Sequence, residues 1–287
     1  MKKVIAILLT LVIALGAVLM LTSCGTDNGD AETTVSAAEN SDATEAEAIV
    51  AAETTVEETT AEETTVEETT VEETTVEENK APESKEEIIE YFNTAVNKVK
   101  SDSKGITHNY SKITLNGSTT LPSSLNTILK LLGGADKFLG DQLEKNSKGS
   151  ETISASGFPV ENESWASKLT AADVSSATCT EADGKYTITV KTVADGKSSN
   201  VTHGQGHAPK AFNVVLPGIV NDNIPGVAQG IVGTATMNYP SSTAKIVVDA
   251  ETGNVLSAEY DLCWTINFDK VGAILPFLTS DSYTIAW

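Results

Sequence analysis

The longest regular pattern in this 287-residue chain is a strict alternation of apolar and polar side chains near its end. From residue 256 to residue 268 every even position is apolar, and every odd position is Ser, Glu, Asp, Cys, Thr or Asn. Successive side chains of a β-strand point to opposite faces, so this pattern predicts a strand with one buried and one wetted face. At ~3.4 Å per residue it would span about 44 Å, far beyond the usual strand. A strand of this length indicates a long, strongly curved sheet.

Shorter alternations predict the neighbours of that strand. Asp183-Gly184 separates two alternating runs, at 174–182 and 185–193, which is a strong hairpin signal. Further strands are expected near 105–117, 150–156, 231–239, 244–248 and 282–287. We therefore expect an antiparallel sheet of about seven or eight strands.

Helices are expected at three places. Ser84 and Glu87 form a capping-box pattern before a helix over about 85–100, whose apolar residues fall on one face and whose Asn93 and Asn97 are expected in solvent. A second helical stretch ends at Gly133-Gly134, and the apolar segment 214–233 is broken by Pro and Gly into short helices or loops. The predicted fold class is α+β: a long curved antiparallel β-sheet with helices packed on one face, preceded by a disordered tether.

The first residues have the features of an export signal. A basic start, Met1-Lys2-Lys3, precedes an uncharged run from Val4 to Leu21. The following Leu21-Thr22-Ser23-Cys24 resembles the lipobox of bacterial lipoproteins. This resemblance implies a signal peptide at 1–23, a diacylglyceryl group on Cys24, and a protein anchored at the extracytoplasmic face of the cell membrane. An uncleaved membrane helix with an incidental cysteine is the alternative.

Residues 24–80 are predicted to be the lipidated cysteine and an acidic stalk. The part from Gly25 to Lys80 holds 18 Asp and Glu and one Lys, and 53–77 repeats the pentapeptide Glu-Thr-Thr-Val-Glu with one Ala for Val. A period of five gives no continuous apolar face on a helix or a strand, so we expect a disordered tether. As a flexible coil it would span roughly 40 Å. The paired threonines are candidate acceptors for O-linked sugars.

The remainder, 81–287, is expected to be a single α+β domain. Its architecture resembles the LolA-like lipoprotein carriers, which implies that acyl chains would bind between the sheet and covering helices. It also resembles uncharacterised lipoproteins of Gram-positive bacteria, which implies no activity. Neither resemblance brings binding residues with it.

Composition excludes one class of partner. The chain carries a formal net charge of −21, and all 19 of its basic residues are Lys. Nucleic-acid binding needs a basic surface and commonly uses Arg, so we expect no nucleic-acid partner. No pattern indicates a cofactor.

Few residues form a candidate reaction site. His203 and His207 could ligate a metal with Asp195 or His108, but the intervening glycines and Pro209 favour a flexible polar loop. Glu161 and Glu163 form a candidate carboxylate pair, as in a glycosidase. Cys179 and Cys263 are expected on opposite faces of the sheet and therefore unpaired. A candidate surface for sugar stacking is formed by Tyr91, Trp165 and Tyr239.

These observations favour a non-enzymatic, lipid-anchored module that binds an apolar or amphiphilic ligand. An adhesion or cell-wall polysaccharide module on a stalk is the alternative. A hydrolase or metal-dependent enzyme centred on His203 and His207 is a third hypothesis.

Lipidation at Cys24 is directly testable. A bacterium that expresses the chain is grown with an alkyne-tagged fatty acid, and label on the purified chain is measured. We expect label on the natural chain and on Cys179→Ala, and none on Cys24→Ala, because the lipobox directs the diacylglyceryl group to that thiol alone. Label retained by Cys24→Ala would contradict the lipobox assignment.

Overall fold

The computed structural model describes residues 80–130, 133–144 and 147–287. The predicted signal peptide, Cys24 and all of the predicted tether except Lys80 therefore lie outside the described residues. Across these described ranges, no helix is long and apolar enough to cross a membrane.

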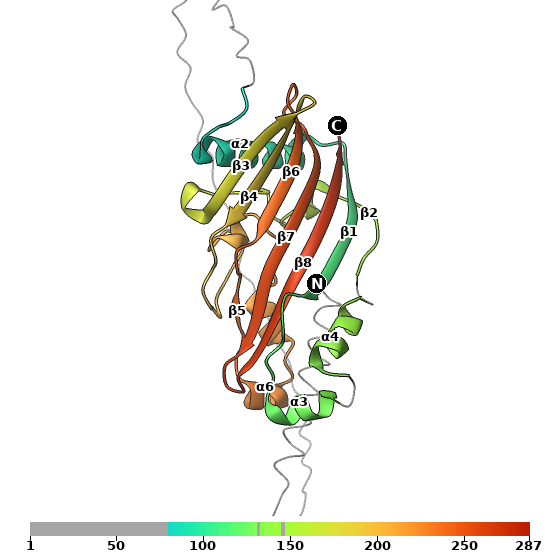
Figure 1. The fold of residues 1–287 in the computed structure, drawn as a ribbon, viewed down its shortest axis with the longest axis vertical. Helices are drawn as coiled ribbons and strands as arrows, with labels where there is room; N and C mark the ends of the chain where they lie inside the picture. Colours follow the sequence, from blue (N-terminus) through green and yellow to red (C-terminus); the bar gives the residue numbers. More distant parts are fainter. Residues whose placement is uncertain (1–79, 131–132, 145–146) are drawn as a thin grey trace, which may run out of the picture. The chain divides into compact units, whose positions relative to one another are not determined.

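The domain is built on an open, antiparallel sheet of eight strands (Figure 1). Seven strands form the path β2-β1-β8-β7-β6-β4-β3, and β5 pairs with β7 beside it. The strands are β1 (Gly105–Leu115), β2 (Glu151–Ile153), β3 (Val174–Ala182), β4 (Lys185–Thr192), β5 (Thr236–Asn238), β6 (Thr243–Asp249), β7 (Val255–Phe268) and β8 (Ala273–Ala286). The antiparallel sheet and the 183–184 hairpin are confirmed.

The two longest strands, β7 and β8, form one hairpin of 14 residues on each side. The alternating segment 256–268 does form a strand, and its even residues from Ala258 to Phe268 point into the core. Leu256 does not, because a register shift against β6 buries Val255 in its place. The predicted strand 282–287 covers only the last five residues of β8. The reason is local: Ala273, Leu275 and Phe277 continue the apolar face, but Thr279 and Asp281 interrupt it.

Helix α2 (Lys85–Asp102) begins at the predicted capping box. The Glu87 amide donates to Ser84 Oγ over 3.2 Å, and the Ser84 amide donates to Glu87 Oε2 over 2.9 Å. The helix crosses β3, β4 and β7 and buries Phe92, Val96 and Val99 against the sheet. The remaining helices are α3 (Ser123–Lys130), α4 (Ala135–Glu144), α5 (Pro217–Asp222) and α6 (Gly226–Val232), with 3-10 turns at Ala155–Gly157, Ala171–Asp173 and Ala208–Lys210.

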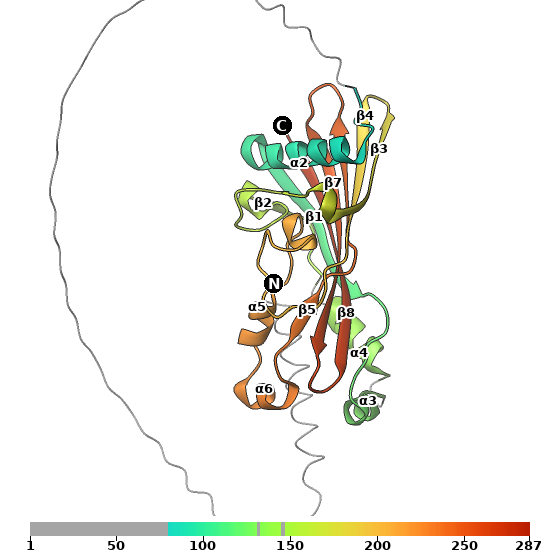
Figure 2. The ribbon, with the colours of Figure 1, turned by 90° about the vertical axis from the view of Figure 1, so that its left-hand side faces the viewer.

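The expectation of helices on one face alone is wrong for α3 and α4. In Figure 2 the β7–β8 hairpin has α5 and α6 on one side and α3 and α4 on the other. The end of β7 explains the difference, because residues 264–268 are buried whichever face they point to, including Thr265 and Asn267. A strand end buried on both faces needs cover on both.

The core between the sheet and the α5–α6 segment is filled by large side chains. Trp264, Phe268 and Tyr239 are fully buried there. The Trp264 ring stacks on Phe277 with centroids 4.4 Å apart, and the Tyr239 hydroxyl donates to Val215 O over 2.8 Å. The segment 214–233 therefore covers the sheet as predicted, through two short helices.

Asn93 and Asn97 do not face solvent, so that prediction is wrong. Asn97 Oδ1 accepts from the amides of Ala166 (2.6 Å) and Ser167 (3.1 Å), and its Nδ2 donates to Ser167 O over 2.9 Å. Asn93 Nδ2 donates to Leu169 O, and Asn93 Oδ1 accepts from Ser167 Oγ. Two turns of α2 therefore hold the strap 166–169, a segment that sequence periodicity along the helix does not reveal.

Removing the Asn97 side chain tests this strap. Asn97→Ala should lower the free energy of unfolding by about 2–3 kcal/mol, because it deletes three hydrogen bonds and leaves partly buried backbone groups unpaired. Urea denaturation of the full chain measures the change. Thr94→Ala, at an exposed position of the same helix, should change it by less than about 0.5 kcal/mol. Equal losses of stability from the two substitutions would contradict the conclusion that Asn97 holds the segment 166–169.

Candidate functional site

A cleft of about 200 Å³ opens on the core face of β1 and β8. It lies between these strands, the segment 148–161 and the segment 213–215. Its lining mixes apolar, polar and charged side chains: His108, Ser111, Ile113, Lys148, Glu151, Ile153, Glu161, Asn213, Val215, Thr279, Asp281 and Tyr283, together with Gly157.

The interrupted alternation of β8 places polar groups in this cleft. Thr279 and Asp281 share a face with buried Phe277 and Tyr283, and they pair across the sheet with Ile113 and Ser111 of β1. A register shift between His108 and Tyr110 keeps His108 on that same face. A polar patch is thus built into an otherwise apolar sheet surface.

His108 and Asp281 form the best-defined polar pair of the cleft. His108 Nε2 lies 2.9 Å from Asp281 Oδ1, and their side chains are only 13% and 18% exposed. The imidazole also stacks on the Tyr283 ring, with centroids 4.4 Å apart and planes at 13°. Burial, and secondarily the Asp281 charge, raises the pKa of Tyr283 well above its ordinary value, so its hydroxyl remains protonated at neutral pH.

The remaining charged groups of the cleft are one pair and one free carboxylate. Lys148 pairs with Glu151 at 3.1 Å. Glu161 makes no hydrogen bond or ion pair within the described part of the chain, and the buried Asn213 Oδ1 has no hydrogen-bond partner there. The Glu161 side chain is exposed, so its carboxylate is the free acceptor that a ligand in the cleft can reach, whereas Asn213 Oδ1 is buried beneath the surface.

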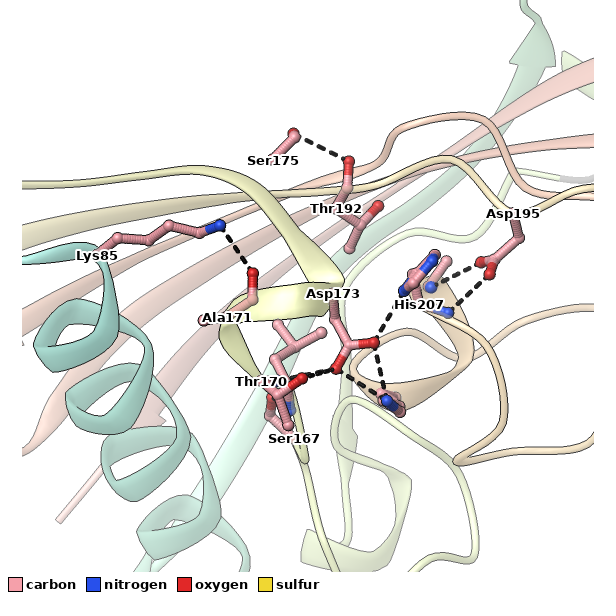
Figure 3. A network of polar contacts seen from close by, with 12 residues as sticks. Lys85, Ser167, Thr170, Ala171, Asp173, Ser175, Thr192, Asp195 and His207 are labelled. Carbon is pink, nitrogen blue, oxygen red and sulfur yellow. Dashed lines mark hydrogen bonds and ion pairs between the residues drawn. The ribbon is translucent and has the colours of Figure 1, made fainter.

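A second polar cluster surrounds Asp173 (Figure 3). His207 Nδ1 lies 2.8 Å from Asp173 Oδ1, Lys210 Nζ lies 2.8 Å from both carboxylate oxygens, and Thr170 Oγ1 donates to Oδ2 over 2.6 Å. Asp195 accepts the amides of His207 and Ala208. This cluster fastens the loop 203–210 to the turn 171–173. Asp195 also lines a separate hollow of about 250 Å³ beside the cluster, together with Gln205 and Gly206.

The electrostatics of the Asp173 cluster are those of a structural ion pair. Burial would raise the pKa of Asp173, but hydrogen bonds from Lys210, Thr170 and His207 outweigh it and lower that pKa to about 2. Asp173 therefore stays ionised and paired at every physiological pH.

The structure separates the two histidines of the metal hypothesis. His207 is held by Asp173, whereas His203 Nδ1 is buried without a partner, and burial lowers the pKa of His203 against the opposing charges of Glu163 and Glu161. Asp195 approaches His207 as anticipated, but it binds backbone amides, and His108 lies in the cleft instead. Within the described ranges, no three His, Cys, Asp or Glu side chains are placed to hold a metal ion.

The structure also places the cysteines, the aromatic residues and the carboxylate pair that the sequence suggested as site residues. Cys179 and Cys263 are both unpaired, as predicted, and burial raises the pKa of each thiol. Trp165 and Tyr239 are buried, so they form no exposed stacking surface with Tyr91. Of the carboxylate pair, Glu161 lines the cleft and Glu163 does not.

Sequence reasoning missed Asp281, Asn213 and the cleft itself. The available signal was the polar interruption at Thr279 and Asp281 between two apolar halves of one alternating run.

Comparisons with family models, curated protein sequences and solved structures found no match for this chain. The carrier-like resemblance therefore rests on architecture alone and stays a prediction.

Asp173→Asn tests the structural role of the second cluster. The folded-state pKa is lowered from 3.8 to about 2, so the carboxylate contributes stability above about pH 4 that is lost as the pH falls to about 2. At pH 6 the variant should be less stable by about 2 kcal/mol, and the difference should shrink between pH 4 and pH 2.

Urea denaturation at each pH measures this difference. The control Asp183→Asn, in the exposed turn between β3 and β4, keeps a residue that tolerates positive φ and should show little difference at any pH. A stability difference for Asp173→Asn that is constant down to pH 2 would contradict the assigned ion pair.

Proposed function

We propose that this chain is a membrane-anchored, extracytoplasmic binding protein without enzymatic activity, and that it holds a small amphiphilic ligand in the β1–β8 cleft. The lipid on Cys24 would fix the chain to the membrane, and the acidic tether would carry the domain away from it. The anchor and tether rest on the lipobox pattern and the Glu-Thr-Thr-Val-Glu repeats.

One observation carries the binding proposal. The sheet face is filled by buried aromatic and aliphatic side chains on both sides of the cleft, at Trp264 and Phe277 and at Tyr283 and Ile285. Between them the cleft leaves about 200 Å³ lined by apolar walls and by polar and charged side chains, among them the free Glu161 carboxylate. A concave apolar site with a few converging polar groups is the usual form of a small-molecule site.

The size of the cleft limits which ligands can bind in it. Typical pockets for drug-sized ligands measure about 300–1,000 Å³, so this cleft suits a smaller molecule or one end of a larger one. Together with the filled core beneath α5 and α6, this favours an amphiphilic ligand over a wholly apolar one.

The polar contacts support a binding role rather than a catalytic one. Activated nucleophiles depend on a neighbouring base, most often a histidine within hydrogen-bond reach. Where the structure describes them, the two paired histidines contact Asp281 and Asp173, and neither contacts a serine or a cysteine.

Co-purification tests the proposal. The full chain and two variants are purified in one detergent and denatured, and the small molecules released are measured by liquid chromatography and mass spectrometry. Ser111→Leu places a larger apolar side chain in the cleft, and Thr114→Leu makes a similar change on the opposite, exposed face of β1.

We expect one compound at about one molecule per chain from the natural protein and from Thr114→Leu, and little from Ser111→Leu. An identical set of released compounds from all three proteins would contradict ligand binding in the cleft.

A further inference from the structure

We infer that the cleft selects a small cationic amine with a short apolar body. This inference rests on the proposed binding function and narrows it to a chemical class. Three properties of the lining converge on that class: its charge, its hydrogen-bonding capacity and its apolar walls.

The charge of the lining is negative. Three carboxylates line the cleft, from Glu151, Glu161 and Asp281, against Lys148 and the His108 imidazole. Lys148 is engaged by Glu151 and His108 by Asp281. Glu161 is left without a counter-ion in the described part of the chain, so the cleft attracts a cation and repels a carboxylate or phosphate ligand.

The hydrogen-bonding capacity of the lining favours a donor. Glu161 is exposed and its carboxylate is an acceptor without a protein partner among the residues described. The Thr279 hydroxyl, by contrast, already accepts from Trp264 Nε1 over 2.9 Å. An ammonium group carries three donors and no acceptor, so it can pair with the Glu161 carboxylate without leaving an unpaired acceptor of its own.

The apolar walls of the cleft favour a ligand with a short apolar portion. Ile113, Ile153, Val215 and the Tyr283 ring line the cleft, and Tyr283 is fixed by edge contacts from Phe158 and Tyr260, with centroids 5.1 and 6.1 Å away. A volume of about 200 Å³ corresponds to roughly seven water molecules at about 30 Å³ each. A short alkyl chain fits this space, whereas a long acyl chain exceeds it.

A matched ligand series tests the inference. The full chain is titrated with n-butylamine, 1-butanol and butyrate at pH 7, and binding is followed by saturation-transfer difference NMR of the ligand. We expect saturable binding of butylamine, at least tenfold weaker binding of butanol, and no binding of butyrate. Butylamine binding should weaken with added salt, because part of it is a charge interaction.

Two carboxylate-to-amide variants locate the charge. Glu161→Gln should weaken butylamine binding at least fivefold, and Glu163→Gln, which changes a neighbouring residue that does not line the cleft, should change it less than twofold. Ser111→Leu should abolish binding. Equal effects of the two glutamine variants, or butylamine binding unaffected by Ser111→Leu, would overturn the inference.

The failures of the two proposals can be told apart. If butanol or butyrate binds more tightly than butylamine in a Ser111→Leu-sensitive way, the amine class is wrong and the binding function stands. If none of the three binds and co-purification also yields no cleft-dependent compound, the binding function fails with it.

Discussion

The rest of this domain depends on the continuous apolar face of β7. Six of its residues, from Ala258 to Phe268, alternate inward, and β8 and β6 extend that face on both sides. Such a surface is stable only when covered, since burying apolar area is the dominant favourable term in folding. Helix α2 covers one end, and the Pro- and Gly-broken segment with α5 and α6 covers the other.

The cleft arises where that apolar face is interrupted. A charged side chain cannot be packed under an apolar cover without a large desolvation cost, so the cover over Asp281 leaves a hollow with polar walls. His108 reduces this cost by pairing with Asp281 and stacking on Tyr283. The polar residues Thr279 and Asp281 thus interrupt the apolar face of the sheet and form the polar part of the cleft. The proposed binding function is placed in the cleft for this reason.

Sequence reasoning recovered what depends on local periodicity and turn chemistry. The β7 alternation, the Asp183-Gly184 hairpin and the Ser84–Glu87 capping box each follow from residues close together in the chain. It failed where partners are distant: Asn97 binds a strap 70 residues away, and His108 meets Asp281 across 173 residues. The full length of β8 was missed because its polar interruption, which forms the cleft, looks like the end of a strand.

The most direct test of this account is a crystal structure of the natural chain purified without added ligand. The account predicts ordered non-protein density in the cleft, in contact with the Glu161 carboxylate and above the stacked His108 and Tyr283 rings. A cleft that holds no such density, or that is closed by the segment 148–161, would contradict it.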